Sequence, residues 1–131
     1  MKSLEIRAAT VTLDDGILRV QLRERVHYTL VDAKETVAAQ RALVGPDDKA
    51  TVLVDMRGIN ASDADARKHF ATPEVERGNA AVALVVDSPV SKVIGNFFIG
   101  LDKPACPTKL FTSEPDAIDW LRGFRQAVTA R

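Results

Sequence analysis

Alternating apolar and polar positions open the chain and predict an antiparallel hairpin. Leu4, Ile6 and Ala8 alternate with polar or charged residues, and the alternation is repeated over residues 18–22. A period of two is typical of a strand that has one face in water. Between the two stretches lies Asp15-Gly16, a strong hairpin-turn signal because glycine tolerates a positive φ.

The pattern then changes to helical spacing. Thr29 and Asp32 resemble a capping box, and the apolar positions that follow recur every three or four residues up to Gly45-Pro46, a typical helix stop. Asp32, Lys34, Glu35 and Arg41 lie off this apolar stripe.

Three predicted strands alternate with helical stretches in the second half of the chain. Residues 51–54 are uncharged and mostly β-branched, which is typical of a strand covered on both faces. Residues 81–86 are the most apolar strand, and residues 108–112 are a short strand with Leu110 and Phe111. A serine is predicted to cap the helix after each strand: Ser62, Ser88 and Ser113. Thr72-Pro73 predicts an additional short helical turn.

The helix after Ser88 has the widest apolar face, which is predicted to be mostly buried. Its members are Val90, Val93, Ile94, Phe97, Phe98 and Leu101. Gly95 inside this helix predicts a close backbone approach, because glycine otherwise costs about 1 kcal/mol relative to alanine. The last helix has a stripe made of Ile118, Leu121, Phe124 and Val128.

The element order is β-β-α-β-α-β-α-β-α in a single domain of residues 1–131. Strands that alternate with helices favour right-handed crossovers and a parallel sheet. We therefore expect an α/β fold with a mixed sheet in which only the first strand is antiparallel. If neighbouring strands follow chain order, the helices lie on one face of the sheet. The other face then needs cover from the hairpin or from a partner, so we expect a homodimer.

Composition excludes several classes of function. Lys plus Arg and Asp plus Glu each number 18 in 131 residues, so a neutral chain gives no electrostatic case for nucleic acid or an anionic membrane. One cysteine excludes an internal disulfide and suits a reducing compartment. Two histidines and one cysteine are too few for a tetrahedral zinc site without carboxylates, and we expect no metal or other cofactor. No signal-peptide-like or membrane-spanning run is present, so we expect a cytoplasmic protein.

Candidate binding residues gather where the parallel strands end. In an open parallel sheet, ligands usually lie beyond the carboxyl ends of the strands. Three loops are expected there, carrying Asp55, Arg57, Asn60 and Ser62, then Asp87 and Ser88, then Thr112 and Ser113. Unpaired N–H groups at a helix start attract phosphate or carboxylate, although the serines also serve as plain caps.

A second reading of the same region involves charge. Arg57 and Arg67, with Asp55, Asp63 and Asp65, form either a polar recognition face or a solvated network of ion pairs.

No group of residues indicates catalysis. His27 and His69 lack an evident carboxylate or nucleophile partner, and Cys106 lies between two prolines near Lys103 and Lys109. Those lysines could lower the thiol pKa, but a plain unpaired thiol is the simpler reading. Neither a phosphate-binding loop nor a Gly-x-Ser-x-Gly motif occurs. We therefore expect a protein that is not an enzyme.

Residues 50–67 resemble the STAS domains, which include the anti-sigma factor antagonists of sporulation. The resemblance rests on a strand ending in Val-Asp, a short loop and a serine near a helix start, and the order of elements agrees along nearly the whole chain. A closer likeness is to small uncharacterised bacterial proteins of the SpoIIAA-like, CRAL-TRIO-related fold. The residues behind it are Asp55, Met56, Arg57, Ala66, Arg67, Asn96, Phe97, Phe98, Pro107, Thr108, Phe111, Trp120 and Leu121.

The resemblance implies a SpoIIAA-like mixed sheet, a protein partner such as an anti-sigma factor kinase, and phosphorylation at Ser62. The antagonist loop reads roughly Asp-Ser-Ser/Thr-Gly, and the matching residues here are 61–64. The second hydroxyl and the glycine are missing, and Asp63 and Asp65 add negative charge that repels a phosphate.

Two functions follow from these observations. The first is a non-enzymatic regulatory domain that binds a protein partner through Asn60, Arg67 and the residues between them. The second is a carrier or sensor of a small apolar ligand or an anion, in which the apolar helix with Phe97 and Phe98 lines a pocket. For that helix, the alternative is an ordinary core, because apolar residues at helical spacing are more often core than pocket.

Overall fold

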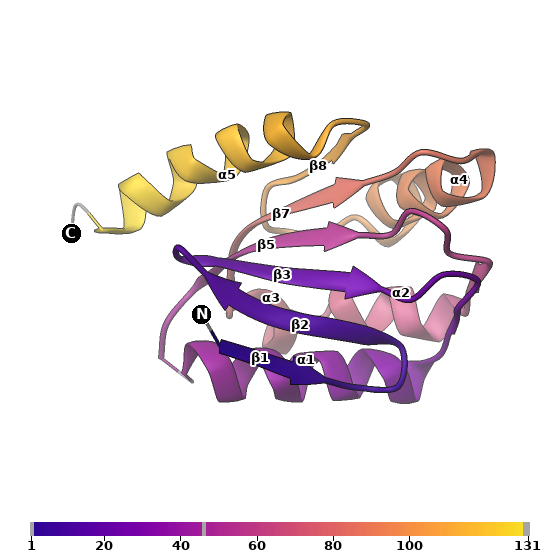
Figure 1. The fold of residues 1–131 in the computed structure, drawn as a ribbon, viewed down its shortest axis with the longest axis horizontal. Coiled ribbons are helices and arrows are strands. Elements are labelled where there is room, and N and C mark those ends of the chain that lie inside the picture. Colours follow the sequence, from indigo (N-terminus) through magenta and orange to yellow (C-terminus); the bar gives the residue numbers. More distant parts are fainter. Residues whose placement is uncertain (1, 46, 130–131) are drawn as a thin grey trace.

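A six-stranded mixed sheet, in the order β1-β2-β3-β5-β7-β8, forms the centre of the protein (Figure 1). The computed structural model describes residues 2–45 and 47–129. The strands of the sheet are β1 (Lys2–Glu5), β2 (Ala9–Asp14), β3 (Ile17–Leu22), β5 (Ala50–Asp55), β7 (Asn79–Val85) and β8 (Thr108–Phe111). β1, β2 and β3 pair antiparallel, and β3, β5, β7 and β8 pair parallel. The predicted mixed α/β sheet is confirmed.

The predicted first strand is divided into two. The chain reverses between β1 and β2, with the Ile6 N–H donating to the Ala9 carbonyl at 3.0 Å. Arg23 satisfies two carbonyls of this reversal, donating to the carbonyls of Arg7 and Ile6 at 3.0 Å each. The apolar positions change from even numbers (Leu4, Ile6, Ala8) to odd numbers (Val11, Leu13) across this turn, so the break in the period of two marks the reversal.

Helices cover both faces of the sheet. The helical elements are α1 (Leu30–Val44), α2 (Ala64–Phe70), α3 (Pro73–Glu76), α4 (Pro89–Phe97), the π-helix η1 (Phe98–Asp102) and α5 (Glu114–Thr129). In Figure 1, α1 and α2 lie on one side of the sheet and α5 on the other. The expectation that all helices share one face is therefore wrong, because α5 covers the second face. The argument for a dimer from an uncovered face is lost with it.

Two core clusters follow from the alternation along β7. Val82 and Leu84 belong to the cluster beneath α1, whereas Ala81 and Ala83 belong to the cluster beneath α5, with the buried Leu121. The alanines let α5 pack close to the strand, because they leave only a methyl group between the two backbones. Pro46, a predicted helix stop, and the side chain of Val128, in the predicted stripe of the last helix, lie outside the described residues.

The apolar face of α4 and η1 is only partly buried, contrary to the expectation. Ile94 and Phe98 pack against the core, but Val90, Val93, Phe97 and Leu101 are 44–67% exposed. The predicted close approach at Gly95 is confirmed, since a Cβ atom there would lie 2.6 Å from Cδ2 of Leu110. The segment is therefore apolar on two sides: one side packs against the core, and the other faces solvent.

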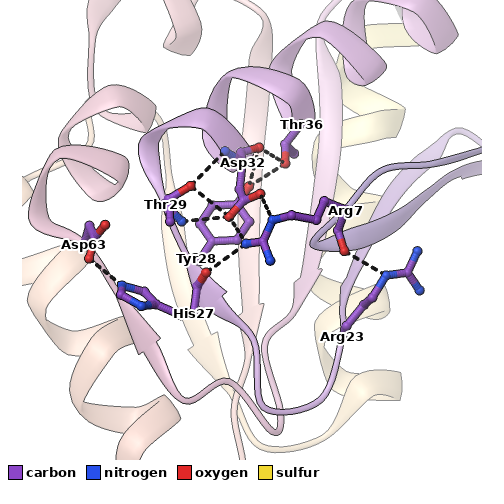
Figure 2. A network of polar contacts seen from close by, with 8 residues as sticks. All are labelled: Arg7, Arg23, His27, Tyr28, Thr29, Asp32, Thr36 and Asp63. Carbon is purple, nitrogen blue, oxygen red and sulfur yellow. Dashed lines mark hydrogen bonds and ion pairs between the residues drawn. The ribbon is translucent and has the colours of Figure 1, made fainter.

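A buried carboxylate ties α1 to the N-terminal strands (Figure 2). Asp32 is 1% exposed, although it lies off the apolar stripe of α1. Arg7 binds both carboxylate oxygens, and the N–H and Oγ1 of Thr29 donate to Oδ2 at 2.9 and 3.0 Å. The predicted capping box at Thr29 is therefore confirmed. These bonds, led by those from Arg7, hold the pKa of Asp32 below its usual range.

Gly95→Val is expected to lower the free energy of unfolding by about 1–3 kcal/mol, because the new side chain collides with Leu110 in a packed region. The same change at Gly123 in α5, where a Cβ would meet nothing within 4 Å, is the matched control. It should alter stability by less than about 0.5 kcal/mol, since glycine and valine are both poor helix formers. Urea unfolding of the two variants measures both values, and equal effects would contradict the close approach.

Asp32→Asn is expected to destabilise the protein at neutral pH by about 1–3 kcal/mol, because it removes the charge from a network of hydrogen bonds. A carboxyl whose pKa is lowered by folding stabilises the folded state above its unfolded pKa of about 3.9. That contribution is lost as the pH falls through the lower folded pKa. The variant should therefore lose part of the decline in stability below about pH 4, as measured by urea unfolding at several pH values. Asp119→Asn, at an exposed ion pair, should keep the decline.

Candidate ligand-binding site

The first predicted site residues, Asp55 and Arg57, are bound to each other. Arg57 donates through Nε and Nη2 to the two carboxylate oxygens of Asp55 at 2.9 and 2.8 Å, and its backbone N–H donates at 3.2 Å. Burial alone would raise the pKa of Asp55, but the hydrogen bonds and charge of Arg57 outweigh it and lower that pKa. The same pairing raises the pKa of Arg57. The two side chains therefore satisfy each other at the end of β5.

Ser62 does not cap a helix, and this prediction is wrong. Ser62 lies in β6 (Ala61–Ser62), which pairs in parallel with β4 (His27–Tyr28), and neither of these short strands was predicted. The N-cap position of α2 is Asp63, whose side chain makes no capping bond. Its Oδ1 instead lies 2.6 Å from Nε2 of His27 (Figure 2). The backbone of Ser62 is extended by this pairing, which moves the helix start one residue later.

Arg67 is an internal connection. Its Nε donates to Oδ2 of Asp102 at 3.1 Å and its Nη1 donates to the carbonyl of Ser62 at 3.1 Å. Its guanidinium also lies 5.7 Å from the ring centre of Phe97. The two charged side chains are 15% and 3% exposed. Arg67 thus joins α2, β6 and η1, and its donors face inward.

Ser88 and Ser113 act as plain helix caps, which was the alternative to anion binding at these positions. Ser88 forms a capping box with Ser91 at the start of α4. Oγ of Ser113 accepts a hydrogen bond from the Asp116 N–H at 3.4 Å. Asn60 is exposed and donates its backbone N–H to the carbonyl of Val26 at 3.0 Å. The predicted residues therefore do not converge on one open polar site at the carboxyl edge, because most of their donors are used internally.

A cavity of about 100 Å³ lies between the sheet and the helices on the α1 face. The sheet contributes Val20, Leu22, Val52, Val54, Val82 and Leu84 to its wall. The helical side contributes Phe70, Ile94 and Phe98. The cavity wall is thus largely apolar, and one part of it comes from the apolar helix that the sequence proposed as a pocket wall. Phe98 lines the cavity, whereas Phe97 is 44% exposed outside it.

Four polar side chains of the cavity wall, those of Tyr28, Thr36, Gln40 and Asn79, are hydrogen-bonded in pairs. The Tyr28 hydroxyl bonds to Thr36 and donates to the carbonyl of Asp32 at 3.3 Å, and burial raises the pKa of this phenol, so it stays neutral. Nε2 of Gln40 donates to Oδ1 of Asn79 at 2.7 Å. Among the described residues, no buried side-chain nitrogen or oxygen lacks a partner. A molecule in this cavity would therefore be held by apolar contact.

Cys106 and Glu76 form another part of the cavity wall. Glu76 is 7% exposed and accepts hydrogen bonds from the Ala105 N–H at 2.5 Å and from Sγ of Cys106 at 3.7 Å. Burial, followed by the charge of Glu76, raises the pKa of the Cys106 thiol. A thiolate activated by Lys103 and Lys109 is therefore excluded, and the reading as a plain thiol holds.

Residues 2–45 and 47–129 contain no cluster of three or more His, Cys, Asp or Glu side chains placed to hold a metal ion. In the same part of the chain, no helix has both the length and the apolar character needed to cross a membrane.

Sequence reasoning found the apolar wall and, in Ser62 and Arg67, two of its polar members, but it missed Tyr28, Thr36, Gln40, Glu76 and Asn79. Val20, Val52 and Leu84 were identified as strand residues, and a strand residue facing a cavity has the same pattern as one facing a packed core. Gln40 and Asn79 gave no signal, because their bond joins α1 to β7 across 39 positions.

Comparison with known structures supports the observed fold. A crystal structure of an uncharacterized protein of the DUF3478 family from Shewanella loihica PV-4, with a SpoIIAA-like fold, has a TM-score of 0.60 and 18% identity. The match covers 92% of this chain and 99% of that chain. This likeness confirms the SpoIIAA-like fold and carries nothing about activity.

A second crystal structure, of a protein with unknown function from Arthrobacter sp. FB24, is 36% identical over 86% of this chain and 97% of that chain, with a TM-score of 0.31. A comparison with curated proteins gives no match. The family model described as "Domain of unknown function (DUF7793)" matches residues 11–125. Because that match spans most of this chain, the chain belongs to the DUF7793 family.

Proposed function

We propose that the protein is a non-enzymatic binding domain that takes up a small apolar group in its cavity, as a carrier or sensor. The observation that carries this proposal is the cavity beneath α4, whose wall is largely apolar. A well-formed apolar pocket is the general form of a small-molecule site. The cytoplasm remains the proposed compartment, because a single cysteine suits a reducing environment.

The size of the cavity limits the ligand. An apolar cavity of about 150 Å³ takes up benzene, so the smaller volume here suits a chain of about four carbon atoms. Burial of each methylene contributes about 0.8 kcal/mol, which gives about 3 kcal/mol for such a chain. The expected dissociation constant is therefore about 1–10 mM for a purely apolar contact.

The segment formed by α4 and η1 provides the route by which a ligand would enter. Ile94, Gly95 and Phe98 line the cavity, and the opposite side of the same segment faces solvent. Arg67 connects the end of this segment to α2 through Asp102. Movement of one short helical segment would therefore open the cavity without disturbing the sheet.

Val54→Phe is expected to weaken binding of 1-pentanol at least fivefold, because the added ring fills space in the cavity that Val54 lines. Binding is measured from methyl chemical shifts of Val20, Val52, Leu84 and Ile94 during titration. Val90→Phe is the matched control, since Val90 is 46% exposed on the outer side of α4.

Equal affinity in the two variants would contradict binding in the cavity, and so would an absence of saturable methyl shifts in the unmodified protein. Native mass spectrometry of freshly purified protein adds an independent readout. A co-purified small molecule that is missing from Val54→Phe would support the proposal.

A regulatory role through protein contact is the second candidate, favoured by the exposed apolar side of α4 and η1. Four large apolar side chains there, Val90, Val93, Phe97 and Leu101, are 44–67% exposed. Such a surface suits protein association better than the internally paired residues 60–67. A second copy of the chain is the simplest partner, and a kinase that modifies Ser62 is the partner that the family resemblance implies.

If two copies associate through this surface, Val93→Glu should convert a dimer into a monomer, because association would bury an unpaired charge. Light scattering over a range of protein concentrations measures the mass. Gln21→Glu, which adds the same charge at an exposed position of β3, should leave the mass unchanged. If the unmodified protein is a monomer at high concentration, the homodimer is ruled out.

A further inference from the structure

A second hollow lies at the opposite edge of the sheet from the residues that the sequence proposed. This groove of about 570 Å³ is bordered by Lys49, Arg77 and Pro107, which precede β5, β7 and β8. It therefore runs along the amino ends of three parallel strands. Lys103, from the loop after η1, and Phe124, from α5, complete its sides.

The groove has an excess of positive charge. Lys49, Arg77 and Lys103 line it against one carboxylate, that of Glu76. All three cations are exposed, and none forms an ion pair or a side-chain hydrogen bond within the described residues. By contrast, Arg57 and Arg67 are each bound to a carboxylate. In a chain with no net charge, three cations without carboxylate partners in one hollow favour an anion there.

The carboxylate of Glu76 does not compete for these cations. It accepts the hydrogen bonds of the Ala105 N–H and the Cys106 thiol, so it is directed at the loop before β8. Lys49, Arg77 and Lys103 consequently keep their N–H donors available to a ligand.

The groove and the cavity share a wall. Glu76, Asn79 and Cys106 line both hollows. One side of this wall is the apolar cavity and the other is the positively charged groove, so the two environments adjoin.

We propose that the ligand is a small amphipathic anion, such as an aliphatic carboxylate, with its chain in the cavity and its charged group in the groove. This inference rests on the proposed function and deepens it, because it adds recognition of a charge to recognition of an apolar chain. The cations supply specificity that the cavity lacks, since the cavity wall is largely apolar.

The test compares pentanoate with 1-pentanol, which share a chain length and differ in charge. Binding is followed by methyl shifts in the cavity and by backbone amide shifts at Lys49 and Arg77. Pentanoate should bind about fivefold more tightly than 1-pentanol, and the advantage should fall as salt is added.

Two triple variants separate local from overall charge. Lys49→Gln, Arg77→Gln and Lys103→Gln together should abolish the advantage of pentanoate and leave 1-pentanol binding unchanged. Lys2→Gln, Lys34→Gln and Lys68→Gln together make the same change in net charge at exposed lysines outside the groove, and they should keep the advantage.

The outcomes distinguish the two proposals. If both probes bind in the cavity with equal affinity, or if the groove variant keeps the preference, the amphipathic anion is ruled out while the proposed function stands. Amide shifts in the groove without methyl shifts in the cavity would show surface binding of an anion, which also overturns the inference. If neither probe shifts the cavity methyl groups, the proposed function fails.

The single cysteine offers a further readout, because Cys106 lies in the shared wall. Saturating pentanoate should slow alkylation of Cys106 at least threefold in the unmodified protein and not in the groove variant. If saturating pentanoate leaves the rate of Cys106 alkylation unchanged, the ligand does not extend across the wall between the cavity and the groove.

Discussion

The parallel pairing of β5 with β7 is the constraint on which the rest of the structure depends. Side chains of the two strands alternate between two faces, so both faces need a covering layer. On one face, Ala81 and Ala83 allow α5 to pack closely against the sheet, and their cluster includes the buried Leu121 of α5. On the other face, the larger Val52, Val54 and Leu84 line the cavity together with Ile94 and Phe98 from the helical layer. The cavity is the space that this second layer leaves unfilled.

Two ion pairs, each with a buried carboxylate, hold the incomplete layer in place. Asp32 binds Arg7 and Thr29 and thereby fixes α1 to the N-terminal strands. Arg67 binds Asp102 and thereby fixes η1 to α2. Such a pair is directional, and removing the cation would leave the buried carboxylate unpaired at a cost in stability. Such pairs therefore position the helices around a space that apolar packing alone would tend to close.

Much of this arrangement could be predicted from the sequence, and the failures have physical causes. Periodicity identified the parallel strands and five of the helices, and Gly95 indicated a close contact that Leu110 supplies. Periodicity could not say that Asp32 is buried, because its partner Arg7 is 25 positions away. The start of α2 was placed one residue early, because the short pairing of β4 with β6 outweighs the preference of serine for a cap. The exposed side of α4 was taken for core, since hydrophobicity alone does not distinguish a buried face from a contact surface.

The sequence placed the candidate site at the carboxyl edge of the sheet, whereas the proposed site lies at the amino edge. This difference also comes from contacts that sequence patterns do not show. The carboxyl edge usually binds ligands because helix starts there have unpaired N–H groups. In this chain Ser88 and Ser113 occupy such groups themselves, and Arg57 is bound to Asp55. At the amino edge, Lys49 and Arg77 have no such internal partners within the described residues, and they line a groove that shares Glu76, Asn79 and Cys106 with the cavity. Polar groups that are already paired have little left to offer a ligand, which is why the proposed site lies at the amino edge and not at the edge richest in candidate residues.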